Sequence, residues 1–363
     1  MTANTIKGSP WIHNRGFDTF FSFGGIVICC FLSIVCSKSE YLFGLIFWGW
    51  ILFFDAPHLF VTFTRTYFKK EFYQNKAVVL ISILFLILPI LLFVMPFRTI
   101  QIGNFTLIEN FLFWAQLWGF WHIVSQHYGF FALYSRKEGA NFTEISYTKF
   151  IFYFPFTLFY LFFLFFHPYN LNLIGLDSLL FIWEFKLLIL FCLLLTYLLC
   201  FKSKLKLYPN KSPKAFFYFF IFLMYYGFVF IFLTEYEPFY KLAKTPTQFF
   251  MLTSLMITLP HNLQYLYIVC VYLINGSGNE KKMSLAFNFK ILLGLFIFSL
   301  MICILGYYSG EFVDTFQVLG NMAYASLAYG IWWGFKIQHY YLDQKIWRFK
   351  NNNQLKKVMQ VPE

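Results

Sequence analysis

The chain has 363 residues, of which 60% are hydrophobic, 25% aromatic and only 12% charged. A soluble domain carries about a quarter charged residues, so this composition excludes an ordinary soluble protein. The formal net charge of +12 comes from lysines and arginines that cluster between apolar runs, as membrane orientation requires, and it does not indicate a nucleic-acid partner.

Repeated apolar runs of about twenty residues predict membrane-spanning helices. In chain order the ten expected spans cover residues 17–36, 41–63, 77–97, 106–134, 149–167, 181–201, 214–233, 246–274, 286–307 and 312–340. We therefore expect an all-α fold, a polytopic transmembrane helix bundle that forms one integral membrane domain over 1–363. The expected location is a bacterial inner membrane.

The basic residues of the connections predict the orientation of these spans. If the N-terminus is cytoplasmic, the cytoplasmic segments hold 21 lysines and arginines and the outer segments hold 4. Because cytoplasmic loops are enriched in Lys and Arg, we expect both termini to be cytoplasmic.

Five of the seven histidines lie well inside expected spans: His58, His122, His127, His261 and His339, whereas His13 precedes the first span and His167 ends the fifth. Their spans are all even-numbered and run from outside to inside, and each histidine lies in the middle or later part of its span. All five are therefore expected in the cytoplasmic half of the membrane. Ionisable groups within membrane spans usually mark functional sites, which favours a functional role for this group. The alternative is that each histidine is structural, with its ring hydrogen-bonded to a neighbouring polar group.

Each histidine has polar neighbours at helical spacing. In "DAPH", Asp55 precedes His58 by three residues; in "HYYLD", Asp343 follows His339 by four. In "HIVSQH", Gln126 shares a face with His122, and His127 is turned by about 140°. In "LPHNLQY", Gln264 and Tyr265 share a face with His261. Carboxylate and imidazole one turn apart are how helical bundles present metal ligands.

This pattern predicts a metal site, with iron as the favoured metal because carboxylates join the imidazoles. The expected ligands are His58, His122, His127, His261 and His339, with Asp55 and Asp343 as carboxylate ligands or as groups that orient the histidines. His339 and Asp343 are the weakest candidates, because their segment runs into the cytoplasmic interface. The residues expected to hold ligands or polarise bound oxygen are Gln126, Asn262, Gln264 and Tyr265.

Prolines directly precede two of the histidines. Pro57 and Pro260 remove a backbone hydrogen bond and release the carbonyls of Phe53 and Met256. Inside a membrane such breaks are tolerated where the backbone is buried in protein or lines a cavity, so both breaks are expected beside the site.

Short identical segments suggest an internal repeat. "PH" occurs in the second and eighth spans, and "QHY" occurs at 126–128 and 338–340. A parallel duplication of 41–134 and 246–340 would build the site from two similar helix pairs. Chance identity in a biased composition is the alternative.

The quoted histidine segments resemble histidine-rich multipass membrane oxygenases, and look most like the bacterial β-carotene-cleaving membrane dioxygenases. This resemblance covers only the helix-embedded histidines. It implies iron near the cytoplasmic face and a lipid-like substrate. The chain has neither the H-x-x-x-H nor the H-x-x-H-H box of desaturases and hydroxylases.

The leading hypothesis is an oxygenase or other oxidoreductase with one or two iron ions. It would act on a membrane lipid or other apolar small molecule, with an electron donor protein on the cytoplasmic side as a further partner. A transporter that relays protons or metal ions through the same residues is the main alternative. A lipid-headgroup transferase and a b-type haem protein are the others.

Overall fold

A computed structural model of the chain describes residues 10–36, 38–94, 100–103, 105–140, 212–222, 246–276, 293–305, 322–348 and 353–359, with isolated helical residues between 149 and 198. These residues are mostly helical, as the sequence predicts. Among them, strands β1 (Gln101–Ile102) and β2 (Phe105–Thr106) form one short antiparallel pair.

The chain divides into two compact units, and neither of them is a continuous stretch of sequence. The first unit contains Met1–Phe47, Ile123–Asn275 and Lys356–Glu363, and the second contains Trp48–His122 and Gly276–Leu355. The single membrane domain and the duplication of 41–134 and 246–340 stay predictions.

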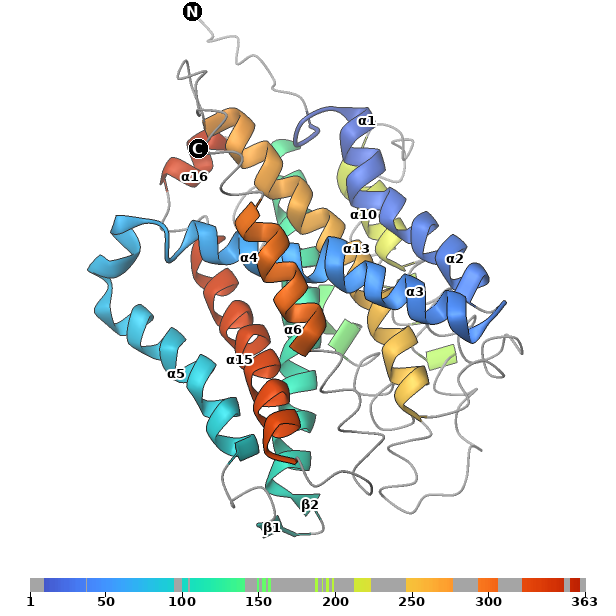
Figure 1. Cartoon of the computed structure of the whole chain (residues 1–363). Helices are drawn as coiled ribbons and strands as arrows, with labels where there is room; N and C mark the ends of the chain where they lie inside the picture. The colour runs from blue at the N-terminus through green and yellow to red at the C-terminus, as the bar shows by residue number, and fades with distance from the viewer. Residues whose placement is uncertain are drawn as a thin grey trace, which may run out of the picture. The chain divides into compact units, whose positions relative to one another are not determined.

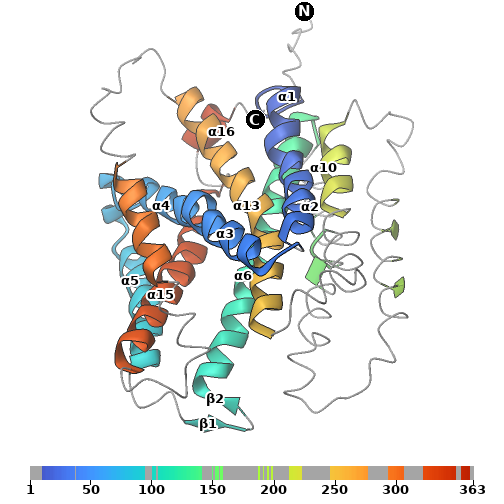
Figure 2. The same cartoon turned by 45° about the vertical axis from the view of Figure 1, so that its right-hand side comes forward.

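The second unit is built mainly from long helices. Its elements are η2 (Ile51–Asp55), α4 (Ala56–Arg65), η3 (Lys70–Gln74), α5 (Lys76–Val94), the first half of α6 (Leu107–Lys137), a helix at Leu293–Leu305 and α15 (Met322–Ile346). In both views α15 runs beside α5 (Figure 1 and Figure 2). A core of Phe93, Ala115, Trp333 and Ile337 joins α5, α6 and α15.

Two glycines bring α15 unusually close to α5. A Cβ atom at Gly330 would lie 2.8 Å from Ile90 Cα, and one at Gly334 would lie 2.5 Å from the Leu86 carbonyl oxygen. Small residues four apart let the backbones of membrane helices approach closely. The segment "GIWWG" therefore fixes the height and rotation of α15 against α5.

The first unit contains α1 (Arg15–Asp18), η1 (Thr19–Phe23), α2 (Gly24–Cys36), the second half of α6, α10 (Pro213–Phe222), α13 (Pro246–Gly276) and α16 (Asn353–Val358), together with most of α3 (Glu40–Trp50). Figure 2 shows α10 beside the segment that runs from α1 into α2. The helices α2 and α13 also meet closely, because a Cβ atom at Gly25 would lie 3.0 Å from Pro260 Cα.

Three helical segments in the described part are long and apolar enough to cross a membrane: Arg15–Cys36, Tyr41–Arg65 and Lys76–Val94. They agree with the first three expected spans. The histidine-bearing helices α6, α13 and α15 are also long, at 31, 31 and 25 residues, but their polar side chains lower their mean hydropathy. Most of the expected spans 149–167 and 181–201, and parts of 214–233, 286–307 and 312–340, lie outside the described residues.

Only the first of the two predicted helix breaks interrupts the regular α-helix. Before Pro57 the chain forms the π-helical turn η2, in which the Ala56 N–H donates to the Ile51 carbonyl. At Pro260 the helix α13 continues, and the Met256 carbonyl accepts a hydrogen bond from the Cys29 thiol at 3.7 Å. π-Turns inside helices are frequent at functional sites. The turn η2 ends at Asp55 and lies close to His58 in the chain, so it supports a functional role for these residues.

Candidate metal centre

Three buried histidines meet in the second unit. His58 comes from α4, His122 from α6 and His339 from α15, and each offers a ring nitrogen within 4.8 Å of the others. The His339 ring lies 4.3 Å from the His58 ring and 4.9 Å from the His122 ring, measured between centroids. Three helices far apart in sequence therefore direct imidazoles at one point.

A carboxylate joins these imidazoles. Asp343 Oδ2 lies 3.6 Å from His339 Nε2 and 3.8 Å from His122 Nε2. Both separations exceed ordinary hydrogen-bond lengths. They approach the spacing of roughly 3.3 Å that separates donor atoms around a tetrahedral ion with bonds of about 2.0–2.1 Å. The arrangement is that of ligands which would contract slightly around one ion.

Thr62 on α4 determines which ring nitrogen of His339 carries the hydrogen. Its hydroxyl donates to Asp343 Oδ1 at 2.7 Å, so its single hydrogen is already used. The 2.9 Å contact between Thr62 Oγ1 and His339 Nδ1 must then have Nδ1–H as the donor. The basic nitrogen of His339 is therefore Nε2, the atom nearest Asp343 Oδ2. Such hydrogen bonds fix the tautomer and orientation of metal-binding histidines.

We expect Thr62→Val to weaken metal binding by roughly 10- to 100-fold, because valine keeps the shape but removes both hydrogen bonds. Thr62→Ser, which keeps the hydroxyl, is the matched control and should bind like the wild type. Competition with a metal chelator on the purified proteins measures the effect. Equal affinities for the valine and serine variants would contradict the role of the hydroxyl.

Asp55, predicted as a ligand or as a group that orients the histidines, lies beside Lys336. Its Oδ2 is 3.4 Å from Lys336 Nζ, and both side chains are largely buried. Lys336 also lies over the Trp332 ring, 4.4 Å from its centroid. The pair joins η2 to α15 one turn from His339, so it helps to place the helix that carries the candidate ligands.

A second polar network holds the same part of α15. The Gln338 amide donates to the Tyr67 hydroxyl at 2.7 Å and to the Ser82 carbonyl at 3.0 Å, and the Tyr67 and Ser82 hydroxyls are 2.7 Å apart. Burial raises the pKa of Tyr67 above its ordinary value. On the other side of His339, the Tyr340 ring packs on His122 with centroids 4.9 Å apart.

The other predicted residues lie in the first unit, where four of them form two hydrogen-bonded pairs. His127 Nδ1 is 2.8 Å from Gln264 Oε1, and because an amide oxygen only accepts, Nδ1–H is the donor. Gln126 donates its amide N–H to the His261 carbonyl at 2.8 Å. Asn262 and Tyr265 are both buried. These contacts hold α6 against α13.

Each of the two "QHY" triplets forms hydrogen bonds to a helix that carries "PH". In the first unit, Gln126 and His127 bond α13, which carries "PH" at Pro260 and His261. In the second unit, His339 bonds Thr62 on α4, which carries the other "PH". Each "QHY" therefore pairs with the "PH" helix of the other proposed copy. This exchange agrees with the duplication hypothesis but does not test it.

An additional buried carboxylate in the first unit had no counterpart in the sequence-based prediction. Asp18 is fully buried and accepts from the backbone N–H groups of Ile12 and His13 and from the hydroxyls of Tyr134 and Tyr267. Its contacts tie the end of α1 and the residues before this helix to α6 and α13. Four donors satisfy this carboxylate, so its role is structural.

Three of the buried histidines that could hold a metal ion, His58, His122 and His339, lie in the second unit. Within the second unit the structure brings together His58, His122, His339 and Asp343. The ligand roles predicted for His127, His261 and Asp55 stay predictions. Thr62 and Lys336 were missed, although Thr62 lies four residues after His58 and Lys336 three before His339, which is the spacing of one helix face.

Compared with protein-family models, curated protein sequences and solved structures, the chain shows no significant match.

Proposed function

We propose that the protein is an integral membrane metalloenzyme that holds iron at His58, His122, His339 and Asp343 and oxidises an apolar, lipid-like substrate. One observation carries this proposal: three buried imidazoles and a carboxylate converge, and Thr62 fixes the tautomer of one imidazole. Histidines that only stabilise a helix bundle have no need to converge with a carboxylate.

The donor set favours iron. Imidazole suits zinc, copper, iron and nickel, while an added carboxylate shifts the preference towards iron or manganese. When bound, iron would supply the one-electron and dioxygen chemistry that amino-acid side chains lack. The chain's own residues supply the rest: they hold the ligands, exclude water and admit an apolar molecule.

The surroundings of the site exclude water. Leu59, Phe63, Tyr341 and Leu342 form a buried apolar cluster on α4 and α15, beside the candidate ligands. An apolar substrate can reach such a site sideways from lipid without losing favourable hydration. Thr62 keeps the proton of His339 on Nδ1, and Lys336 Nζ lies 3.4 Å from Asp55 Oδ2.

The geometry favours a non-haem site over the haem alternative. The rings of His58 and His339 meet edge to face at a centroid distance of 4.3 Å. Two histidines that bind opposite faces of one haem are separated by the macrocycle. Direct ring contact therefore fits ligands that share one small ion.

A proton or metal-ion transporter is the second candidate, and two observations favour it. Lys336 and Asp55 form a largely buried ion pair, and the π-turn η2 with Pro57 interrupts regular helix geometry in the same place. Intramembrane ion pairs and broken helices occur in proton relays and transporters. A transporter would bind its metal weakly or not at all.

Elemental mass spectrometry on detergent-purified protein from iron-supplemented cells, with an absorption spectrum, tests the proposal. We expect one or two iron ions per chain, no Soret band, and oxygen uptake when lipids or carotenoids are added. Absence of any stoichiometric metal would overturn the metalloenzyme. Proton flux into liposomes that contain the protein would then support the transporter.

A further inference from the structure

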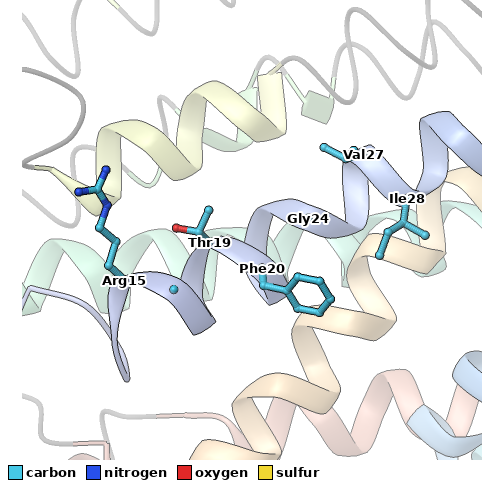
Figure 3. Close-up of a pocket in the computed structure, with 7 residues that line it drawn as sticks. Arg15, Thr19, Phe20, Gly24, Val27 and Ile28 are labelled. Carbon is cyan, nitrogen blue, oxygen red and sulfur yellow. The ribbon is translucent and has the colours of Figure 1, made fainter.

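A shallow groove runs along the first apolar helical segment. None of the residues that line it is a candidate metal ligand. Its volume is about 610 Å³, and it is lined by Arg15, Gly16, Thr19, Phe20, Gly24, Val27 and Ile28. Figure 3 shows Arg15 at one end and Val27 and Ile28 at the other, with Gly24 between them. The groove therefore has one charged end and an apolar length.

The length of this groove matches one leaflet of a bilayer. From Thr19 to Ile28 the backbone rises about 14 Å at 1.5 Å per residue. Half of a hydrocarbon core of about 30 Å is about 15 Å. The segment Arg15–Cys36 is long and apolar enough to cross a membrane, and Phe20 and Val27 are 57% and 62% exposed. An acyl chain can therefore lie against it.

The charge at the end of the groove is available to a ligand. Asp18, the carboxylate nearest in sequence, is saturated by two backbone N–H groups and two tyrosine hydroxyls. Arg15 is exposed and forms no ion pair with any residue that the structure describes. It stands where the polar segment ending at Asn14 meets the apolar helix, which is the depth of lipid headgroups.

We propose that this groove binds one anionic phospholipid, with its phosphate at Arg15 and an acyl chain along Phe20, Gly24 and Ile28. An arginine pairs with phosphate through two parallel hydrogen bonds. Because Gly16 and Gly24 lack side chains, they leave room in the groove for the acyl chain. The proposal is independent of the metal site, because none of the groove residues belongs to it.

Native mass spectrometry tests this binding. The full-length protein is equilibrated with equal amounts of phosphatidylglycerol and phosphatidylcholine, and retained lipid is counted as detergent is exchanged. We expect Arg15→Gln to lower the preference for phosphatidylglycerol about fivefold, since one basic residue near a membrane surface contributes about that factor. Gly24→Leu should reduce retention of both lipids by filling the groove.

Two control variants separate these effects from general ones. Lys38→Gln removes an exposed charge beyond the other end of α2, and Gly44→Leu adds the same side chain on α3 where a Cβ atom meets nothing within 4 Å. Both should retain lipid like the wild type. Equal headgroup preference in Arg15→Gln and the wild type would overturn the proposal. A wild-type dimer that Gly24→Leu converts to monomer would also overturn it, in favour of a second copy of the chain.

Discussion

Replacing His339 with alanine is expected to lower metal affinity more than a hundredfold, so that the purified variant contains almost no metal. His339 contacts every other part of the candidate site: the rings of His58 and His122, the carboxylate of Asp343 and the hydroxyl of Thr62. Loss of a residue that only supports a ligand costs about 10- to 100-fold in affinity, and loss of a ligand should cost more.

The measurement is metal content after dialysis against a chelator, and it does not depend on knowing the substrate. His13→Ala is the control, because His13 is an exposed histidine of the first unit. Circular dichroism and gel filtration show whether His339→Ala keeps its fold. Folded His339→Ala protein that retains wild-type metal content would remove His339 from the ligand set.

The second large effect is on stability. Lys336→Met should lower the free energy of unfolding by about 3–5 kcal/mol, because it leaves the buried Asp55 carboxylate without its cation. The side chains of Lys336 and Asp55 are only 14% and 8% exposed. In thermal unfolding in detergent, the expected fall in Tm is roughly 4–7 °C. A thiol-reactive dye can follow unfolding, since Cys29 and Cys36 are buried.

The double variant Asp55→Leu with Lys336→Met isolates the ion pair. Replacing both charges with apolar side chains is often neutral or stabilising, so most of the lost Tm should return. Lys345→Met, which removes an exposed lysine of α15, should leave Tm unchanged. If Asp55→Leu on top of Lys336→Met gives no recovery, the loss of Lys336 acts through packing on Trp332 rather than through the charge.

Helix positions were largely predictable because they depend on local sequence. Apolar runs placed the first three spans within a few residues of Arg15–Cys36, Tyr41–Arg65 and Lys76–Val94. The close contact of α15 with α5 was not predicted. The glycines of "GIWWG" are visible in the sequence, but whether Gly334 faces Leu86 depends on which helix lies next to it, and no local pattern contains that information.

In the candidate site, too, contacts within one helix were predictable and contacts between helices were not. Spacing on one helix correctly paired His339 with Asp343. Partners on other helices could not be read from the sequence. Asp55 was placed with His58 because they are three residues apart, but its contact with Lys336 from α15 was not predicted. Thr62 was overlooked because a hydroxyl becomes informative only when an imidazole and a carboxylate from another helix are seen to reach it.

The discontinuous second unit has a consequence for biosynthesis. Thr62 and His339, which share a hydrogen bond, are separated by 277 residues. At about 5–20 residues per second, the ribosome needs roughly 15–55 s to add that length. His58 is present throughout that interval and His122 from its sixtieth residue onward, but both lack α15. The metal proposed for this site can therefore be loaded only after nearly the whole protein has been made.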